Sequence, residues 1–363
     1  MKILMLVYRL NVGGTEKYMI NLAWALMRLG IRVEIATSGG PLVQTCRRQG
    51  IPVHLLSGFS KGSSVSKLSR LIAARGYHLL HANDSLSYQL VASVHSRRKI
   101  PVVLTVHGRY HNKPALRRAA KIARRIIVVT PNLSAWVRAL HLPVHKAVQI
   151  PLGVRTDLFR PLNQTSCRKK LGLPLSGSLL AYASRFAKDK YPVAKKVILA
   201  SEKIAKISPK FIAVLAGPGM YRKRLSLLAA QVNRRIGRKA VIVRPPITQI
   251  WQLYGAANAV VGTGTVANEA MACGKPLIAA GAKSYFGIVQ KSNLSHAMHH
   301  QFGDHGGNRP VTVGHLARDA ERVLNAPGWS VELGKMGRNI TLHRFSAIKI
   351  ASQIRKLYLG CLR

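Results

Sequence analysis

The segment "VVGTGTVANEAMACGKPLIAAG" at residues 260–281 decides the fold. It contains an apolar run, a Gly-Thr-Gly-Thr turn, a helical stretch that stops at Cys-Gly-Lys-Pro, and a second apolar run. This order is typical of a parallel βαβ unit. Because the predicted helix begins at the glycine turn, the free amides near Gly264 and Thr265 offer an anion site.

Glu269 lies about one turn into this predicted helix, in a chain that has only 11 acidic residues. A carboxylate at this position can accept two hydrogen bonds from a vicinal diol such as a ribose. The alternative is a glutamate that only stabilises the positive end of the helix dipole. The residue types alone leave both interpretations open.

The same alternation of short apolar runs and helical patterns extends along most of the chain. Apolar runs predict strands at residues 2–8, 32–37, 78–83, 101–108, 126–130, 178–186, 210–219, 239–246, 257–264 and 276–281. Amphipathic or basic stretches between them predict helices, including 15–30, 64–76, 115–125, 193–207 and a last helix at 346–362. This alternation predicts an α/β protein with parallel sheets.

A segment rich in Pro and Gly at 150–177 interrupts the alternation and predicts a linker. We therefore expect two Rossmann-like domains, at 1–160 and at 161–340. The helix within 341–363 is expected to pack back on the first domain. Two doubly wound domains that face each other across a cleft place their ligands at the carboxyl ends of the strands.

The composition is strongly basic, with 57 Lys and Arg against 11 Asp and Glu and a formal net charge of +46. Such a chain attracts anions, and charge alone does not choose among nucleic acid, anionic lipid and a phosphorylated substrate. The four scattered cysteines lack a CxxC pair, which predicts a reducing compartment without a zinc or disulfide framework. No apolar run approaches the roughly 18 residues of a membrane span.

Further candidate residues follow the predicted strands. Gly13 and Gly14 open the first helix and allow a ligand to approach the backbone, although a turn without a ligand explains them too. His107 ends an apolar strand, where a structural histidine is the alternative. In "HANDS" at 81–85, helix capping explains Asp84 as well as a functional role does.

In the second half, Arg185 and Lys190 follow the first strand of the predicted domain. Guanidinium and ammonium groups suit a diphosphate, and a solvated basic loop is the alternative. Gly217 belongs to a further glycine turn, "AGPG", after a strand.

Together these motifs resemble those of the retaining, nucleotide-sugar-dependent glycosyltransferases of family 4, which have the two-domain GT-B fold. The resemblance covers nearly the whole chain, and it implies that 1–160 is the acceptor domain and 161–340 the nucleotide-sugar-binding domain. It rests on "GGTEKYMINLAWALMRLG", "TVHG", "VTPNLSAWV", "PLGVRTDLFRP", "SRFAKDK", "AGPG" and "NEAMACGKPLIAAG", in this order.

The resemblance implies a role for each candidate. Gly14 would lie against the donor phosphates or the acceptor, and His107 would contact the transferred sugar. Arg185 and Lys190 would hold the departing diphosphate, and the amides near Gly264 and Thr265 would complete that cradle. Glu269 would match the second glutamate of the family's Glu-x7-Glu pattern, which holds the nucleoside ribose.

The first glutamate of that pattern would fall at position 261, where this chain has valine. Valine cannot accept a hydrogen bond from the donor sugar, so the sugar stays open. No DxD pair is present, and we expect Arg185 and Lys190 to replace a metal ion at the diphosphate. No cofactor is expected beyond the nucleotide-diphosphate sugar, and a metal site at His296, His299 and His300 is disfavoured because Asp304 is the only acid nearby.

The residues at 115–125 predict an amphipathic basic helix with Arg117, Lys121 and Arg124 on one face and Arg118 and Arg125 beside it. Such a helix can bind an anionic membrane surface, and a solvated helix face is the alternative. We expect a cytoplasmic enzyme, peripheral on the membrane, that uses a glycan or lipid-linked acceptor in the cell envelope.

Two rival functions remain at this stage. The high basic charge favours a non-catalytic protein that binds nucleic acid or an anionic surface, although the aromatic content of 6% offers little for stacking on bases. A GT-B sugar-nucleotide epimerase would consume a nucleotide sugar without an acceptor. Specific nucleic-acid binding is not expected.

Overall fold

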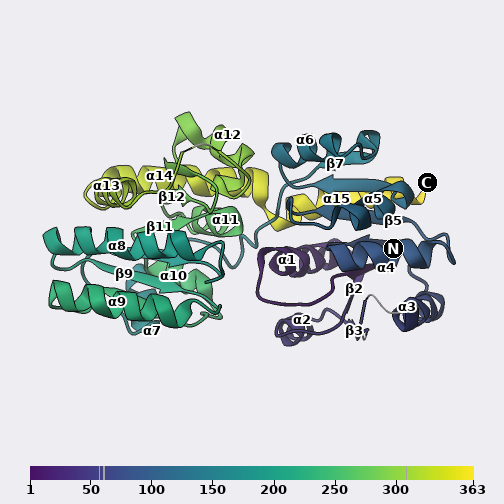
Figure 1. The fold of residues 1–363 in the computed structure, drawn as a ribbon, viewed down its shortest axis with the longest axis horizontal. Coiled ribbons are helices and arrows are strands. Elements are labelled where there is room, and N and C mark those ends of the chain that lie inside the picture. Colours follow the sequence, from purple (N-terminus) through teal and green to yellow (C-terminus); the bar gives the residue numbers. More distant parts are fainter. Residues whose placement is uncertain (57, 60–61, 308) are drawn as a thin grey trace. The chain divides into compact units, whose positions relative to one another are not determined.

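The computed structural model describes residues 1–56, 58–59, 62–307 and 309–363. The chain forms two compact units (Figure 1). Unit 1 comprises residues 1–153 and 345–363, and unit 2 comprises residues 154–344. Each unit has its own sheet and its own hydrophobic core. The predicted α/β class with two Rossmann-like domains is confirmed.

Among the described residues of unit 1, a seven-stranded parallel sheet has the order β3-β2-β1-β4-β5-β6-β7. Its strands are β1 (Lys2–Leu6), β2 (Arg32–Thr37), β3 (Val53–Leu55), β4 (Leu79–Ala82), β5 (Val102–Val106), β6 (Arg125–Val128) and β7 (Ala147–Gln149). Its helices are α1 (Gly14–Arg28), α2 (Val43–Arg48), α3 (Gly62–Arg75), α4 (Ser85–His95), α5 (Lys113–Ile122), α6 (Pro131–Ala139), the 3₁₀ turn η1 (Val144–Lys146) and α15 (Ala347–Leu362).

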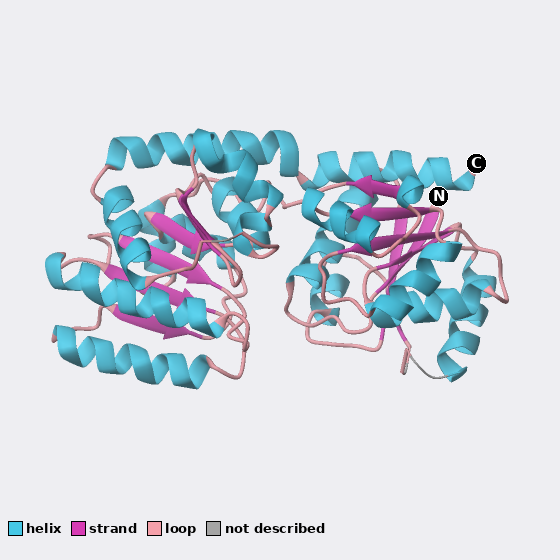
Figure 2. Ribbon diagram, turned by 45° about the horizontal axis from the view of Figure 1, so that its top comes forward, coloured by secondary structure: helices cyan, strands magenta, loops and turns pink. Residues whose placement is uncertain are grey.

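Helices cover both faces of this sheet (Figure 2). Helix α4 packs between α3 and α5, and α1 packs against the C-terminal helix α15. The central strands β4 and β5 are consequently buried along their whole length. Burial on both faces explains why these strands are continuous apolar runs rather than alternating patterns.

In unit 2, the described strands form a sheet of order β10-β9-β8-β11-β12-β13, in which only β13 is antiparallel to its neighbour. The strands are β8 (Leu179–Ala183), β9 (Ile212–Ala216), β10 (Val241–Arg244), β11 (Ala259–Gly262), β12 (Leu277–Ala280) and β13 (Tyr285–Ile288). The helices are α7 (Gln164–Lys170), α8 (Tyr191–Ile207), α9 (Arg222–Ile236), α10 (Ile250–Ala256), α11 (Gly264–Ala272), α12 (Lys291–His299), η2 (Gln301–Gly303), α13 (Val313–Leu324) and α14 (Pro327–Ile340). A π-helical turn, η3 (Thr341–Phe345), follows α14.

Within unit 2, α8 packs against α9 and α13, while α11 packs against α10 and α14. Both sheets therefore have helices on their two faces, as a doubly wound fold requires. The strand order reverses between β1 and β4 in unit 1 and between β8 and β11 in unit 2. The carboxyl ends of these strand pairs are the topological switch points, where ligands bind in such sheets.

Two expectations about individual elements are wrong. The segment 150–177 is more than a linker, because helix α7 lies within it and buries Cys167 and Arg168. The Arg168 guanidinium donates to the carbonyl oxygens of Ala256 and Gly177 at 3.1 and 3.0 Å, which fastens this segment to unit 2.

The predicted basic helix at 115–125 ends at Ile122. Ala123 has extended backbone angles, and Arg125 is the first residue of β6. Arg124 and Arg125 are therefore not on the helix, although both are exposed. The exposed charges of α5 are Lys113, Arg117, Arg118 and Lys121.

Candidate functional site

The loop after β8 carries the two predicted diphosphate ligands. Arg185 is exposed, and its guanidinium lies 4.0 Å from the equally exposed carboxylate of Asp189. Lys190 is the N-cap residue of α8, and its side chain is only 12% exposed. Both residues therefore lie at the unit 2 switch point, one in solvent and one largely enclosed.

The glycine turn after β9 shapes this loop. A Cβ atom on Gly217 would lie 1.7 Å from the carbonyl oxygen of Ser184, so no other residue fits without moving the backbone. The amide of Phe186 donates to the carbonyl of Pro218 at 2.6 Å, which fixes the loop on either side of Arg185. The structure thus gives Gly217 a packing role in positioning Arg185.

The turn from β11 into α11 is very short, because Thr263 is the single residue between Gly262 and Gly264. Gly264 has φ +57°, a conformation that glycine adopts without strain. Val261 lies inside β11, fully buried in the core of unit 2. Position 261 therefore faces packed apolar side chains.

The N-terminal amides of α11 receive no side-chain cap from Thr263, whose hydroxyl donates instead to the carbonyl of Gln301 at 3.0 Å. A carboxylate from a distant loop lies there. Asp304 Oδ1 forms an ion pair with Lys190 Nζ, and Asp304 Oδ2 lies 3.4 Å from the point that a Cβ of Gly264 would occupy. Lys190 and the start of α11 are thus brought together around one carboxylate.

Glu269 is 2% exposed and accepts a hydrogen bond from the Tyr254 hydroxyl at 3.0 Å. Burial, with the nearby Glu269 carboxylate, raises the pKa of Tyr254 well above its usual value, so the hydroxyl remains a donor. Sequence reasoning missed Tyr254, which lies on α10 and reaches Glu269 only through the packing of α10 on α11.

In unit 1, the start of α1 is closely packed. Gly13 is its N-cap, and a Cβ there would lie 2.4 Å from a carboxylate oxygen of Glu16. Glu16, in the first turn, therefore folds back on the helix start, where a negative charge is favourable. Thr15 Oγ1 and the Tyr110 hydroxyl are 3.1 Å apart, which connects Gly14 and its neighbours to the loop after β5.

His107 lies one residue past β5 and is 7% exposed. Its ring packs edge-on against the Tyr18 ring of α1, with centroids 5.0 Å apart, and its Nε2 lies 3.4 Å from Asn83 Oδ1. His111, which sequence reasoning missed, accepts a hydrogen bond from the His107 amide at 3.2 Å. Burial lowers the pKa of His111 to about 4, so its ring is neutral near pH 7.

Asp84 has the capping role that the sequence left open. Its carboxylate accepts hydrogen bonds from the Ser87 amide at 2.8 Å and the Tyr8 amide at 2.5 Å, and it forms a capping box with Ser87. Burial raises the pKa of Asp84, while these amide hydrogen bonds oppose the rise. Asp84 therefore caps the start of α4 and, through its hydrogen bond with Tyr8, connects the segments that follow β1 and β4.

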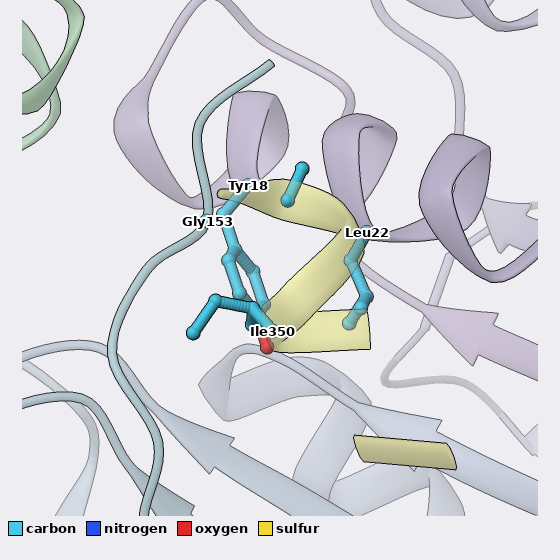
Figure 3. A pocket seen from close by; sticks show the side chains of 5 residues that line it. Tyr18, Leu22, Gly153 and Ile350 are labelled. Atoms are coloured by element: carbon cyan, nitrogen blue, oxygen red, sulfur yellow. The ribbon is translucent and has the colours of Figure 1, made fainter. Parts of the chain in front are cut away.

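A small apolar gap in unit 1 contains none of the candidate residues. Figure 3 shows Tyr18, Leu22 and Ile350 around Gly153, with Ala347 completing the lining. A Cβ at Gly153 would lie 3.0 Å from the Cα of Ala347, so the chain leaves unit 1 tight against α15. This gap is a packing feature of α1 and α15 rather than a ligand site.

Within the described ranges, no group of three or more His, Cys, Asp or Glu residues is arranged to hold a metal ion. The rings of His296 and His300 pack around Phe286, at 5.1 and 5.7 Å between centroids, which gives these histidines aromatic partners. No helix among the residues described is long and apolar enough to cross a membrane.

The chain is similar to known proteins over most of its length. The model of Glycosyltransferase Family 4 matches residues 12–158, and the model of Glycosyl transferases group 1 matches residues 163–293. The chain is 26% identical over 322 residues to a D-inositol 3-phosphate glycosyltransferase of Thermobispora bispora, covering 74% of each protein.

Solved structures have the same fold. The crystal structure of Anabaena HepE in complex with UDP-glucose matches with a TM-score of 0.78 and 20% identity, over 99% of this chain and 100% of that one. Sucrose-phosphate synthase from Thermosynechococcus elongatus matches with a TM-score of 0.74 and 22% identity, over 99% and 98% of the two chains.

The two family models together span most of both units, and the fold of nearly the whole chain matches those solved structures. The chain therefore belongs to glycosyltransferase family 4, and it is an enzyme that transfers a sugar from a nucleotide-sugar donor.

Proposed function

We propose that unit 2 binds the nucleotide-diphosphate sugar at the β8/β11 switch point. The observation that carries this proposal is that Lys190 and the uncapped start of α11 at Gly264 both lie next to the same carboxylate, Asp304. A cation and free helix amides are the two groups that stabilise negative charge on a diphosphate. Arg185, exposed in the same loop, supplies a second cation, and the amide of Thr265 adds to the cradle.

The nucleoside end of the donor is assigned to Glu269. Its carboxylate lies on α11, five residues after Gly264, so a ligand with phosphates at the helix start directs its ribose along the helix. The hydroxyl of Tyr254 holds one oxygen of that carboxylate. The two hydroxyls of a ribose would donate hydrogen bonds to that carboxylate.

The chemical step follows from these charges. Breaking the bond between the sugar and the diphosphate builds negative charge on the departing phosphate. Once the donor is bound, Lys190, Arg185 and the α11 amides would stabilise that charge and so lower the barrier. We propose that these groups make a metal ion unnecessary, that His107 contacts the transferred sugar and Gly14 the phosphates or acceptor, and that the anomeric configuration is retained.

The acceptor is proposed to be a glycan or a lipid-linked component of the cell envelope, reached at the cytoplasmic face of the membrane. Support comes from the exposed cations Arg117, Arg118 and Lys121 on α5. Each Lys or Arg near an anionic surface contributes about 1 kcal/mol of binding free energy. A phosphorylated inositol belongs in the acceptor panel, because the curated relatives carry that acceptor in their names.

Thermal unfolding with a panel of nucleotides and nucleotide sugars, in EDTA, tests the donor site. A ligand at about 100 times its dissociation constant adds roughly 2.7 kcal/mol to the free energy of unfolding. We expect one nucleotide class to stabilise the wild type selectively. Glu269→Gln should weaken that binding by about 10- to 100-fold, because a hydrogen bond to a charged group contributes roughly 1.5–3 kcal/mol.

Tyr254→Phe is the matched control, because it removes the hydrogen bond to Glu269 and leaves the carboxylate. Its nucleotide affinity should stay within a few-fold of wild type. Absence of any nucleotide effect, together with salt-sensitive retention of RNA, would instead identify a basic binding protein. Consumption of the donor without acceptor, with a new sugar stereochemistry by NMR, would identify an epimerase.

A further inference from the structure

The proposed diphosphate site already contains an anion that belongs to the protein. Asp304 pairs with Lys190 through Oδ1, and its Oδ2 lies beside Gly264 at the start of α11. The Asp304 side chain is 25% exposed and the Lys190 side chain 12%, so this ion pair is only partly solvated. Asp304 thus pairs with one of the groups that the proposed function assigns to the diphosphate, Lys190, and lies beside the other, the start of α11.

The backbone that presents Asp304 is strained. Gln301 and Phe302 have φ angles of +52° and +56°, and Gly303 follows with +104°. Residues other than glycine adopt this left-handed region at an energetic cost, and such strain persists only where surrounding contacts enforce it. Two consecutive residues of this kind, followed by Gly303 and then Asp304, make this turn unusual in the described chain.

The contacts that enforce the turn come from the neighbouring loops of unit 2. The carbonyl of Gln301 accepts from Thr263, while the carbonyl of Gly303 accepts from the amides of Lys283 and Ser284 at 3.0 and 3.1 Å. Phe302 is 2% exposed and anchors the turn in the core. Residues 301–303 are therefore fixed, while the Asp304 carboxylate at the edge pairs with Lys190 and accepts a hydrogen bond from the Ala282 amide at 3.5 Å.

We propose that Asp304 is an internal competitor of the donor diphosphate. Its carboxylate occupies Lys190 and the start of α11 when no nucleotide is bound, and the diphosphate displaces it. The inference rests on the proposed function, because it needs the diphosphate to bind at these two groups. A carboxylate left within about 5 Å of a diphosphate would repel it, so the side chain has to move when the nucleotide binds.

This arrangement would make the site selective among anions. The chain has a net charge of +46 and attracts inorganic phosphate and other small anions as well as its substrate. A single phosphate offers little charge beyond the carboxylate that it must replace. A nucleoside diphosphate adds a second phosphate and the contact with Glu269, so it displaces Asp304 where inorganic phosphate does not.

Isothermal titration of UDP, GDP and inorganic phosphate into wild type and Asp304→Asn tests the proposal. Asparagine keeps the shape and removes the charge. Asp304→Asn should bind the preferred nucleoside diphosphate about 10- to 100-fold more tightly, and phosphate binding should become measurable. Asp304→Glu retains a carboxylate and should stay within a few-fold of wild type.

The matched control is Asp189→Asn. It removes one negative charge from the loop that carries Lys190 and leaves the ion pair of Lys190 with Asp304 intact. It should change the nucleotide affinity less than about threefold. Thermal unfolding of each variant without ligand checks that the fold is retained.

The outcomes separate the two proposals. Unchanged or weaker nucleoside diphosphate binding by Asp304→Asn, with the wild type still binding, overturns the competitor and leaves the donor site standing. Unchanged UDP binding with weaker UDP-glucose binding also overturns it, and identifies Asp304 as a contact of the sugar. If neither wild type nor Asp304→Asn binds any nucleotide, the proposed function falls as well.

Discussion

The two switch points have the same topology, but the aspartates that lie there, Asp84 and Asp304, have different roles. In unit 1, Asp84 caps the helix that follows it and accepts hydrogen bonds from two amides. In unit 2, Asp304 comes from a loop 114 residues after Lys190 and pairs with that lysine beside the uncapped start of α11. A carboxylate held by backbone amides of its own unit belongs to the fold, whereas we propose that one held by a distant cation beside a helix start is exchanged for a ligand.

Removal of the Lys190 cation is the strictest test of this difference between the two aspartates. Lys190→Met should lower kcat by about 10²–10³-fold, because an electrostatic contact with the departing group contributes roughly 2.7–4 kcal/mol to catalysis. Steady-state transfer assays with the identified donor would measure this. The exposed Lys188→Met, two residues earlier, should retain nearly full activity. Equal losses in the two variants would show that only the general charge of the loop matters.

The next largest effect concerns the basic surfaces of the two units. Neutralising Arg117, Arg118 and Lys121 on α5 should weaken binding to vesicles containing anionic lipid by about 2–3 kcal/mol, roughly 1 kcal/mol per charge. The control neutralises three exposed charges on α9 of unit 2: Arg222, Lys223 and Arg234. Vesicle co-sedimentation should respond only to the α5 set. An equal response would mean that general basicity, and not α5, holds the protein at the surface.

A pH effect should arise from unit 1. His81 of β4 is fully buried between the Tyr358 hydroxyl of α15 and the Thr105 hydroxyl, each at 2.6 Å, and burial lowers its pKa to about 3. The unfolded chain, with a histidine pKa near 6.5, binds the proton more readily, so stability is full above about pH 6.5 and declines toward pH 3. His81 alone should cost about 2 kcal/mol between about pH 7 and pH 5.

Urea unfolding at a series of pH values would measure this slope. His81→Gln keeps groups that can hydrogen-bond to Thr105 and Tyr358 but does not titrate, so its stability should depend less on pH. A slope as steep as that of wild type would place the acid sensitivity in another group, such as His111, whose pKa burial lowers to about 4.

The smallest predicted effect is that of the cap itself. Asp84→Ala should lower the free energy of unfolding by about 1 kcal/mol, the usual cost of losing an N-cap side chain. It should leave nucleotide affinity unchanged, because its partners are amides of unit 1. Denaturant unfolding and nucleotide titration of the same variant measure both quantities. A loss of nucleotide affinity without a loss of stability would remove the distinction between the two acids.

Local patterns in the sequence predicted those helices and strands that depend on residues close together in the chain. The apolar runs predicted the central strands, and the 3–4 spacing predicted α1, α8 and α15, because burial of one face imposes that periodicity. The short edge strands β3 and β7 have no fully buried residue, and β13 spans only 4 residues, so none of them produces a clear pattern. Helix α7 was hidden by the prolines and glycines around it. Arg168 on α7 donates a hydrogen bond to the carbonyl of Ala256, which lies far along the chain.

The features of the candidate site also fall into those that the sequence predicted and those that only the structure showed. Gly264, Lys190 and Glu269 follow strands or open helices, so the sequence by itself determined their place at the carboxyl edge of a sheet. The tertiary structure alone decided that Asp304 lies on Lys190, that Tyr254 holds Glu269 and that Val261 is enclosed in the core. The physical reason is that periodicity and capping act over a few residues, whereas these contacts join segments that only the packing of a folded sheet and its helices brings together.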